Sequence, residues 1–383
     1  MILLNEEQTK AVYSKDQFIF LLAGAGSGKT RVIVERIKHL IETGINPKEI
    51  LCITFTKKAS LEMTKRLSDY ALSIHTFHGY CYQQLAKIKT FKVFEHTNVF
   101  KEDEILEVSN YKNSIKTTKK PKIYDTYQKY LKERNLLDFD DLMMETIKHI
   151  KTHPYKYIFV DEFQDTNLLQ FKLLETMIKK DTFCFTVGDP DQSIYAFRGA
   201  RFELIDQFVK QYQASVLKLS KNYRSNDLII DAANNLIKHN KNRFKKHLEA
   251  LKIATNDPLI FIYEKDLIMQ KVVELIKIKR LYQAVILYRN HYQVSYLKQL
   301  LEQNFLFDVR LLSFHESKGL EFDTVIIIGA EILPYDKDNI FFNKEEERRL
   351  FFVGITRAIN NLYIFSTRKT KFLKETKLAY SNI

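Results

Sequence analysis

FIFLLAGAGSGKT, residues Phe18–Thr30, joins a short apolar run to a glycine-rich loop that ends in Lys-Thr. The run Phe18–Leu22 contains only aromatic and aliphatic residues and predicts a buried strand. After the loop, apolar residues recur at helical spacing through Thr30–Thr43, with charged residues between them, and predict an amphipathic helix. A strand, a glycine-rich loop and a helix in this order are the context that a phosphate-binding loop requires.

The residues of this loop suit the phosphates of a nucleotide. Glycine lets backbone N–H groups turn toward the phosphates without a side chain in the way, and the helix N-terminus adds a favourable dipole. We expect Lys29 to reach the β- and γ-phosphates of ATP and Thr30 to bind Mg²⁺. Ala23 replaces the first glycine of the strict pattern, and a purely structural glycine turn is the alternative. The expected phosphate-binding residues are Gly24, Ala25, Gly26, Ser27, Gly28, Lys29 and Thr30.

Similar apolar runs recur along the chain and are mostly separated by helical patterns. The first series is Phe18–Leu22, Ile50–Phe55, Tyr157–Val160 and Phe183–Val187. The second series is Val216–Ser220, Leu259–Tyr263, Ala284–Tyr288, Thr324–Gly329 and Leu362–Ser366. This alternation predicts an α/β fold with two parallel, helix-covered sheets in succession.

The length agrees with two domains, because 383 residues exceed one ordinary core of about 100–200 residues. We place the first domain at 1–212 and the second at 213–383. The stretch from about 81 to 150 is Lys-rich, helical in pattern and poor in strands, so it predicts a small helical insertion in the first domain.

Composition narrows the class of protein. Lys and Arg number 60 against 47 Asp and Glu, and the net charge of +13 suits a polyanion such as nucleic acid. A general bias toward Lys in the source proteome is the alternative. No apolar run approaches the roughly 18 residues of a membrane span, so we expect no membrane partner. Cys52, Cys81 and Cys184 show no metal-ligand spacing and predict reduced core residues of a cytoplasmic protein.

Two acidic residues follow the third expected strand of the first series. Asp161 and Glu162 would lie at the carboxyl edge of a parallel sheet, where α/β proteins bind their ligands. Asp161 suits a magnesium contact, and Glu162 suits the base that deprotonates the attacking water. An isolated Asp-Glu pair is usually a solvated loop, and only its place after a phosphate loop favours catalysis. After the fourth strand, Gln192 is positioned to sense the γ-phosphate.

Ordered motifs along nearly the whole chain resemble the UvrD/Rep/PcrA family of superfamily 1 helicases. The matching segments are Leu4–Val12, TFTKKAS at Thr54–Ser60, TFHGY at Thr76–Tyr80, DEFQDT at Asp161–Thr166, GDPDQSIYAFRGA at Gly188–Ala200, LSKNYRSND at Leu219–Asp227, SFHESKGLEFDTVI at Ser313–Ile326 and EEERRLFFVGITRA at Glu345–Ala358. The resemblance implies two RecA-like P-loop domains and an ATPase that moves 3′ to 5′ on single-stranded DNA and unwinds duplex DNA. Repair, replication or recombination would be its setting.

The resemblance also implies further nucleotide contacts. Gln8 would read adenine and Tyr223 would stack on it, while Arg31 and Glu321 would lie near the base or sugar. Arg224 and Arg357 would act as arginine fingers when the two domains close, because a guanidinium stabilises charge on the phosphoryl oxygens. The expected catalytic residues are therefore Lys29, Glu162, Gln192, Arg224 and Arg357.

Single-stranded nucleic acid is commonly held by aromatic stacking platforms beside cations and hydroxyls. By resemblance, the residues that would line the strand are Phe55, His78, Tyr195, Phe197, Arg198, Ser313 and His315. Phe197 stands where the family commonly has tryptophan, which offers a larger stacking face. For Phe55 and Phe197, a core aromatic is the alternative interpretation.

The chain departs from the family in its accessory regions. Phe305–Val309 leads directly to Ser313, so the large 2B subdomain is expected to be absent, and the 1B insertion is shortened. Translocation is therefore better supported than strong unwinding at junctions of single and double strands. A motor subunit of a partner nuclease, repair or defence complex is the second interpretation. A nucleotide-gated binding module or an inactive relative is the third.

Overall fold

The computed structural model describes residues 3–94, 99–115, 117–150, 152–335 and 343–382. Parts of the expected insertion at 81–150, residues 95–98 and 116, lie outside this description. Contacts between Cα atoms divide the chain into two compact units. The first unit comprises Met1–Ala23, Lys29–Asp189 and Tyr195–Leu219, and the second comprises Gly24–Gly28, Pro190–Ile194 and Ser220–Ile383.

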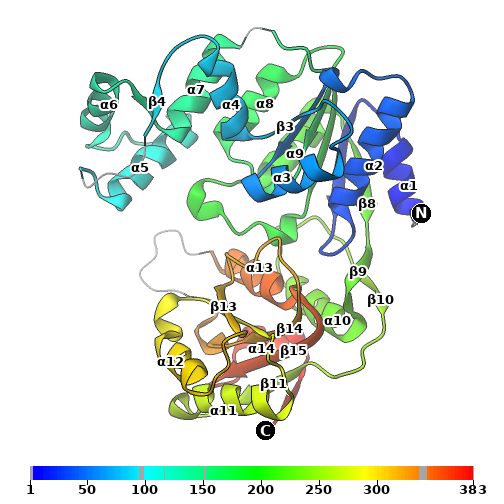
Figure 1. The fold of residues 1–383 in the computed structure, drawn as a ribbon, viewed down its shortest axis with the longest axis vertical. Coiled ribbons are helices and arrows are strands. Elements are labelled where there is room, and N and C mark those ends of the chain that lie inside the picture. The colour runs from blue at the N-terminus through cyan, green and yellow to red at the C-terminus, as the bar shows by residue number, and fades with distance from the viewer. Residues whose placement is uncertain (1–2, 95–98, 116, 151, 336–342, 383) are drawn as a thin grey trace. The chain divides into compact units, whose positions relative to one another are not determined.

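The first unit is built on a six-stranded parallel sheet with the order β3-β2-β6-β7-β1-β8. Its strands are β1 (Phe18–Ala23), β2 (Ile50–Thr54), β3 (Ser73–Thr76), β6 (Tyr157–Val160), β7 (Phe183–Gly188) and β8 (Ser215–Leu219). The helices around it, visible in Figure 1, are α1 (Glu6–Tyr13), α2 (Lys29–Glu42), α3 (Lys57–Arg66), α4 (Phe77–Ala86), α7 (Phe139–His149), α8 (Leu168–Met177) and α9 (Glu203–Tyr212). The central strands are almost entirely buried, which explains their continuous apolar sequences.

The helical insertion has a small core of its own. It contains α5 (Glu102–Asn113) and α6 (Tyr124–Glu133), with the short parallel pair β4 (Lys92–Val93) and β5 (Leu136–Leu137). Phe94, Phe100 and Tyr127 pack edge to face in this core. Since α5 also contacts α7 and α8, the insertion is joined to the body of the first unit by packed helices (Figure 1).

The second unit contains another six-stranded parallel sheet, ordered β13-β12-β14-β15-β11-β16. Its strands are β11 (Leu259–Ile262), β12 (Val285–Tyr288), β13 (Arg310–Ser313), β14 (Phe322–Ile327), β15 (Ala358–Ser366) and β16 (Ala379–Ser381). Its helices are α10 (Asp227–Ile237), α11 (Lys265–Ile278), α12 (Ser295–Gln303), α13 (Lys344–Ile355) and α14 (Lys371–Thr376). A separate parallel pair joins β9 (Lys221–Asn226) to β10 (Glu249–Lys252). Two sheets of this kind confirm the predicted α/β class with two RecA-like folds.

One strand lies in a different sheet from the one predicted. The run at Val216–Ser220 was expected to open the second series, and this is wrong, because β8 pairs with β1 in the first sheet. Within the two six-stranded sheets, three strands were not predicted: β3, β13 and β16. Their side chains are mostly half-buried or exposed, so they lack the continuous apolar run that marks an interior strand.

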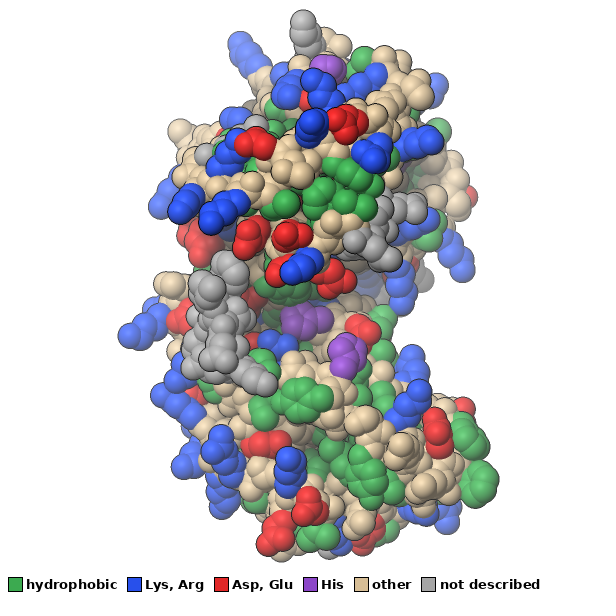
Figure 2. Space-filling view, turned by 90° about the vertical axis from the view of Figure 1, so that its left-hand side faces the viewer, with side chains coloured by type: hydrophobic (Ala, Val, Ile, Leu, Met, Phe, Trp, Pro, Cys, Tyr) green, Lys and Arg blue, Asp and Glu red, His purple; other side chains and the backbone are tan. Residues whose placement is uncertain are grey.

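Charged side chains of both signs are mixed on the one face of the molecule that Figure 2 shows. Lys and Arg side chains are scattered there among acidic ones over each unit. Within the described part of the chain, no helix is both long enough and apolar enough to cross a membrane.

Candidate nucleotide site and nucleic-acid interface

The acidic pair of the first unit follows β6 directly. Asp161 is buried, and its Oδ1 accepts a hydrogen bond of 2.9 Å from the backbone N–H of Glu162. Glu162 adopts a left-handed conformation with φ 51° and ψ 43°, which is uncommon for a residue with a side chain. Such strain is frequent at functional sites, where the surrounding structure holds a side chain in one direction. Here that direction is toward Lys29.

Lys29 begins α2, immediately after the glycine-rich loop. Its Nζ lies 3.1 Å and 3.2 Å from the two carboxylate oxygens of Glu162, so the predicted phosphate-binding cation and the predicted base form an ion pair. Residues separated by more than 100 positions in the sequence therefore meet at the carboxyl edge of the first sheet. This is the edge at which open α/β sheets bind ligands.

The carboxylates at this edge of the sheet stabilise positive charge and oppose further negative charge. Burial lowers the pKa of Lys29, but the nearby carboxylates of Glu162, Asp189 and Asp161 outweigh that effect and raise the pKa above its ordinary value. Burial and the charge of Glu162 raise the pKa of Asp161 to about 7. Lys29 is thus held charged, while the ionisation of Asp161 is opposed by its surroundings.

Gln164 joins the acidic pair to the next strand, and sequence reasoning assigned no role to this residue. Its Nε2 donates to Glu162 at 2.6 Å and to Asp165 at 3.2 Å. Its Oε1 accepts from the backbone N–H of Asp189 at 2.8 Å, just beyond β7. The side chain is fully buried, so it fixes the loop that follows β6 against the end of β7. Its only sequence signal was its position inside DEFQDT.

The expected magnesium ligands in the first unit are Thr30 and Asp161. A hydroxyl and a buried carboxylate are oxygen donors of the kind that Mg²⁺ prefers, and the raised pKa of Asp161 shows negative charge that a cation would relieve. Across residues 3–94, 99–115, 117–150, 152–335 and 343–382, no three His, Cys, Asp or Glu side chains are grouped to hold a metal ion. The residues therefore fit an ion bound mainly through phosphates and water, with few protein ligands.

The other expected nucleotide contacts of the first unit are Gln8 and Arg31. Gln8 is buried in α1, where its backbone N–H donates to Asn5 at 2.8 Å and its Oε1 accepts from the Asn5 N–H at 3.2 Å. This capping box fixes the start of the helix and holds the Gln8 amide in place. Arg31 lies on the first turn of α2, two residues after Lys29.

The glycine-rich segment Gly24–Gly28 belongs to the second unit by its contacts. Asn222 Nδ2 donates to the Ala25 carbonyl at 2.6 Å, and the Tyr223 N–H donates to the Gly26 carbonyl at 2.9 Å. Gly26 has φ +64°, and a Cβ at this position would lie 2.7 Å from both Arg224 Cβ and Asn222 Nδ2. Only glycine fits here without moving β9, for reasons of both backbone conformation and space. Asn222, which holds the segment in place, was not identified from the sequence.

Two expected arginines of the second unit form well-ordered networks. Arg224 Nε donates to Glu321 at 2.7 Å, so two residues predicted for the nucleotide site are partners. Arg357 is buried, and its Nη2 donates to the side-chain oxygen of Gln192 at 3.2 Å. Lys318 Nζ donates to the Gln192 carbonyl at 2.8 Å. The glutamine predicted to sense a phosphate is thus held by two cations.

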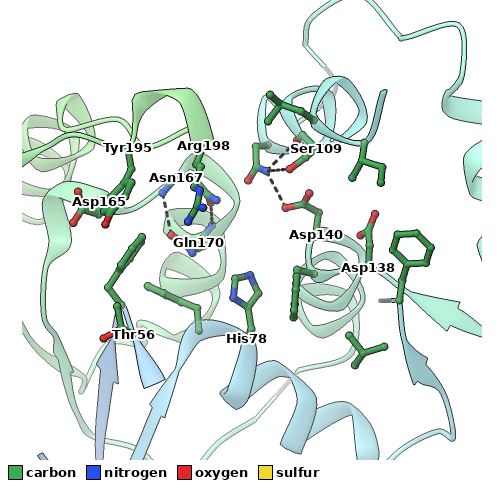
Figure 3. A pocket seen from close by; sticks show the side chains of 18 of the residues that line it. Thr56, His78, Ser109, Asp138, Asp140, Asp165, Asn167, Gln170, Tyr195 and Arg198 are labelled. Atoms are coloured by element: carbon green, nitrogen blue, oxygen red, sulfur yellow. Dashed lines mark hydrogen bonds between the residues drawn. The ribbon is translucent and has the colours of Figure 1, made fainter. Parts of the chain in front are cut away.

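A pocket of about 750 Å³ lies within the first unit, between the sheet edge and the insertion (Figure 3). Five residues of this unit were predicted to line single-stranded DNA, and four of them line the pocket. They are Phe55, His78, Tyr195 and Arg198. The fifth, Phe197, is not among the lining residues, but it is 40% exposed and its ring centroid lies 6.1 Å from that of Tyr195. The core alternative is therefore wrong for Phe197.

The aromatic rings of the pocket are arranged as stacking surfaces. Phe55 and Tyr195 are stacked, with centroids 5.3 Å apart and an interplanar angle of 21°. The Arg198 guanidinium lies 5.8 Å from the Tyr195 ring and 5.4 Å from the Phe197 ring. Rings beside a cation are the elements that bind single-stranded nucleic acid without sequence readout.

His78 faces an aromatic residue that sequence reasoning did not identify as a contact. Phe139, the first residue of α7, is 54% exposed, and its centroid lies 4.8 Å from that of His78. Burial lowers the pKa of His78 to about 4, although Asp138 opposes this effect. The imidazole is therefore neutral at pH 7 and acts as a ring rather than a cation.

The other two residues predicted to line single-stranded DNA belong to the second unit and are Ser313 and His315. Ser313 ends β13, and its Oγ donates to Glu316 at 2.8 Å while its N–H donates to the same carboxylate at 2.7 Å. His315 follows two residues later in the same turn. These contacts fix the turn and leave the predicted DNA contact as a proposal.

Comparison with known proteins supports the resemblance. Residues 8–198 match a family described as an AAA domain, and residues 217–307 and 305–369 match the UvrD-like helicase C-terminal domain. The chain is 33% identical over 366 residues to the ATP-dependent DNA helicase PcrA of Staphylococcus aureus, an alignment that covers 79% of this chain and 49% of the relative. It is 32% identical over 388 residues to a probable DNA helicase II homolog of Mycoplasma capricolum, covering 83% of this chain and 54% of the relative.

These matches establish the family but not the activity of the whole protein. The chain spans about half the length of the relatives that it matches. The first match covers every strand of the first sheet except β8, and the second begins within β8 and covers every strand of the second sheet except β16. The chain belongs to the UvrD-like helicases of superfamily 1.

Proposed function

We propose that the protein is an ATP-driven motor that moves 3′ to 5′ along single-stranded DNA and separates strands at junctions with duplex. Repair, replication or recombination would be its setting. We also propose a domain boundary after Leu219 rather than at the expected 212/213, because β8 pairs with β1 in the first sheet. The 1B insertion would be reduced and the 2B subdomain absent.

One observation carries this proposal: a single loop of the first unit serves both the nucleotide residues and the aromatic pocket. Glu162 pairs with Lys29, and Asp165, three residues later, lines the pocket with Phe55 and Tyr195. Gln164 donates to both carboxylates and so ties one end of the loop to the other. A change at the phosphates would reach the pocket through these two hydrogen bonds, and a motor needs coupling of this kind.

The chemistry follows from the residues at each end of this loop. Lys29 would hold the β- and γ-phosphates, and Glu162 would accept a proton from the attacking water. Mg²⁺, held by Thr30 and Asp161, would neutralise phosphate charge. Gln192 would sense the γ-phosphate, and Arg224 and Arg357 would stabilise charge on the transferred group. Gln8, Arg31, Tyr223 and Glu321 would contact the base and sugar, and Ser313 and His315 would contact the strand.

The test measures ATP hydrolysis with and without single-stranded DNA. We expect strong stimulation by DNA, and we expect it to disappear in Lys29→Ala. Direction is read from the displacement of streptavidin placed at either the 5′ or the 3′ end of a single strand, and faster displacement from the 5′ end supports 3′ to 5′ movement. Equal hydrolysis with and without DNA would instead favour a nucleotide-gated binding module.

A motor subunit of a nuclease, repair or defence complex is the second candidate. It is supported by the two-segment match at 217–307 and 305–369, whose segments meet close to the position at which we propose that a 2B subdomain is absent. Its signature would be displacement of a protein block from single strands without separation of a duplex that carries a 3′ tail.

A further inference from the structure

The pocket in the first unit has two chemically different sides. Figure 3 shows Tyr195 and Arg198 on one side and Ser109, Asp138 and Asp140 on the other. The first side comes from the helicase motifs. The second side comes from α5 and from the start of α7, and no sequence motif assigned a function to it. Its side chains are hydrogen-bond acceptors and a hydroxyl rather than cations.

Asn113 brings an acceptor with spare capacity to this second side. It lines the pocket, is 5% exposed, and uses Nδ2 to donate to Asp140 at 2.8 Å and to the Ser109 carbonyl at 3.0 Å. Among the described residues, no group donates a hydrogen bond to its buried Oδ1. If the Asn113 nitrogen and oxygen were exchanged, the oxygen would face two other acceptors, the Asp140 carboxylate and the Ser109 carbonyl. These partners therefore fix the orientation of the amide.

Asp140 is the second acceptor. Its side chain bonds with Ser109 and with Asn113, while a carboxylate offers about four acceptor positions in all. A buried acceptor such as Asn113 Oδ1 costs free energy when no donor reaches it, and this cost favours a ligand that supplies N–H groups.

Charge restricts what can enter beside these acceptors. The pocket is lined by the carboxylates of Asp138, Asp140 and Asp165 and by one cation, Arg198. Lys112 pairs with Asp138 at 2.6 Å and neutralises it, but two carboxylates remain against one guanidinium. A phosphate is repelled by such a lining, whereas an uncharged aromatic ring is not. The strand would thus present its bases here and keep its phosphates outside.

We propose that Asn113 and Asp140 read the base in this pocket and give the protein a preference for bases with an exocyclic amino group, such as cytosine and adenine, over thymine and uracil. The amino group donates to both acceptors, while the carbonyl of thymine or uracil at the same position would face them with a third acceptor. The inference rests on the proposed function, since it assumes that single-stranded DNA occupies the pocket.

The test compares oligodeoxycytidylate with oligodeoxyuridylate of equal length. Cytosine and uracil have the same ring, and at the fourth ring position cytosine carries an amino group where uracil carries a carbonyl. Binding is measured by fluorescence anisotropy at about pH 8, where carboxylates are ionised. We expect the cytosine strand to bind about fivefold to a hundredfold more tightly, as for a base read by two hydrogen bonds.

Two variants and one matched control locate the preference. Asp140→Asn replaces one acceptor by an amide of the same shape, and Asn113→Ala removes the other acceptor. Asp125→Asn makes the same charge change on α6 of the insertion, where Asp125 is exposed and paired with Lys120. We expect the ratio of the two affinities to fall toward one in both pocket variants and to stay unchanged in Asp125→Asn. Circular dichroism checks that each variant is folded.

The outcomes separate this inference from the function on which it rests. If neither strand binds, the proposed function fails. If both bind equally, the proposed function stands and the reading of bases is overturned. A preference for cytosine that survives in both folded pocket variants would also overturn the assignment to Asn113 and Asp140.

Discussion

The charge of Glu162 is predicted to have opposite effects on ATP hydrolysis and on ATP binding. Glu162→Gln keeps the shape of the side chain but removes its ability to accept a proton from water. A positioned general base contributes about 10²–10⁴-fold to a rate, so kcat is expected to fall by about that factor, or by about 2.7–5.4 kcal/mol of transition-state stabilisation. The hydrogen bond from Gln164 still has an oxygen acceptor in the variant, so the loop should keep its conformation.

Binding should change in the other direction because Glu162 pairs with Lys29. The two side chains lie 3.1 Å apart and remain partly exposed, so the pair contributes about 1 kcal/mol, as exposed pairs do. Phosphates that attract Lys29 must compete with this pair. Without the negative charge, the Kd for ATP is expected to fall by up to about fivefold.

The assay combines steady-state hydrolysis at saturating single-stranded DNA with titration of a fluorescent ATP analogue. Glu49→Gln is the matched control, because Glu49 forms an ion pair of 2.7 Å with Lys156, which precedes β6, whereas the acidic pair follows the other end of that strand. It should leave both measurements unchanged. A loss of kcat smaller than about tenfold would refute the role of Glu162 as the base. Weaker ATP binding in Glu162→Gln would refute the competition for Lys29.

Three further predictions concern other parts of the first and second units. Gly26→Ala should abolish ATP binding measured by the same analogue, because the new Cβ would lie 2.7 Å from β9 atoms at a φ of +64°. Tyr195→Ala should weaken single-strand affinity by about 1–3 kcal/mol in anisotropy titrations, whereas Tyr82→Ala, which removes an exposed ring outside the pocket, should not. Burial and the charge of Asp138 raise the pKa of Asp140 to about 6, so its ionisation costs folding free energy as the pH rises. Urea unfolding should therefore show Asp140→Asn to be more stable than the parent by about 1–3 kcal/mol at about pH 8, with the gain lost by about pH 4.

Lys29, Asp161 and Glu162 could be predicted as candidate nucleotide-site residues because each follows a run of sequence that clearly predicts a strand. Phe18–Leu22 leads into the loop before Lys29, and Tyr157–Val160 leads into Asp161 and Glu162. Parallel strands bring such ends to one edge, and the structure places Lys29 against Glu162 there. The left-handed backbone of Glu162 could not be foreseen, since it depends on the contacts of Gln164 and Lys29 rather than on local propensity.

No sequence pattern of comparable strength predicted the second side of the pocket, which contains Asn113 and Asp140. Asn113 lies at the end of α5 and Asp140 at the start of α7, 27 positions apart. Asp140 belongs to Leu137–Leu142, which resembles a segment of the helicase family, but that resemblance implied no role for it, and Asn113 belongs to no recognised motif. Their contact arises from the packing of helices, and nothing in local periodicity specifies which polar residues face each other across such an interface. The same limit explains β8, whose sequence predicts a strand but not which sheet it joins.

The two parts of the proposed DNA interaction should respond differently to salt. The net charge is +13, and on the face shown in Figure 2 the basic side chains are mixed with acidic ones. Attraction between surface cations and phosphates weakens as salt is added. The pocket contributes ring stacking and hydrogen bonds to uncharged bases, which salt screens far less. Total affinity should thus decrease with salt for every strand, while the ratio between cytosine and uracil strands stays constant. Affinity and base preference would then have separate physical origins, the first in the surface charge and the second in Asn113 and Asp140.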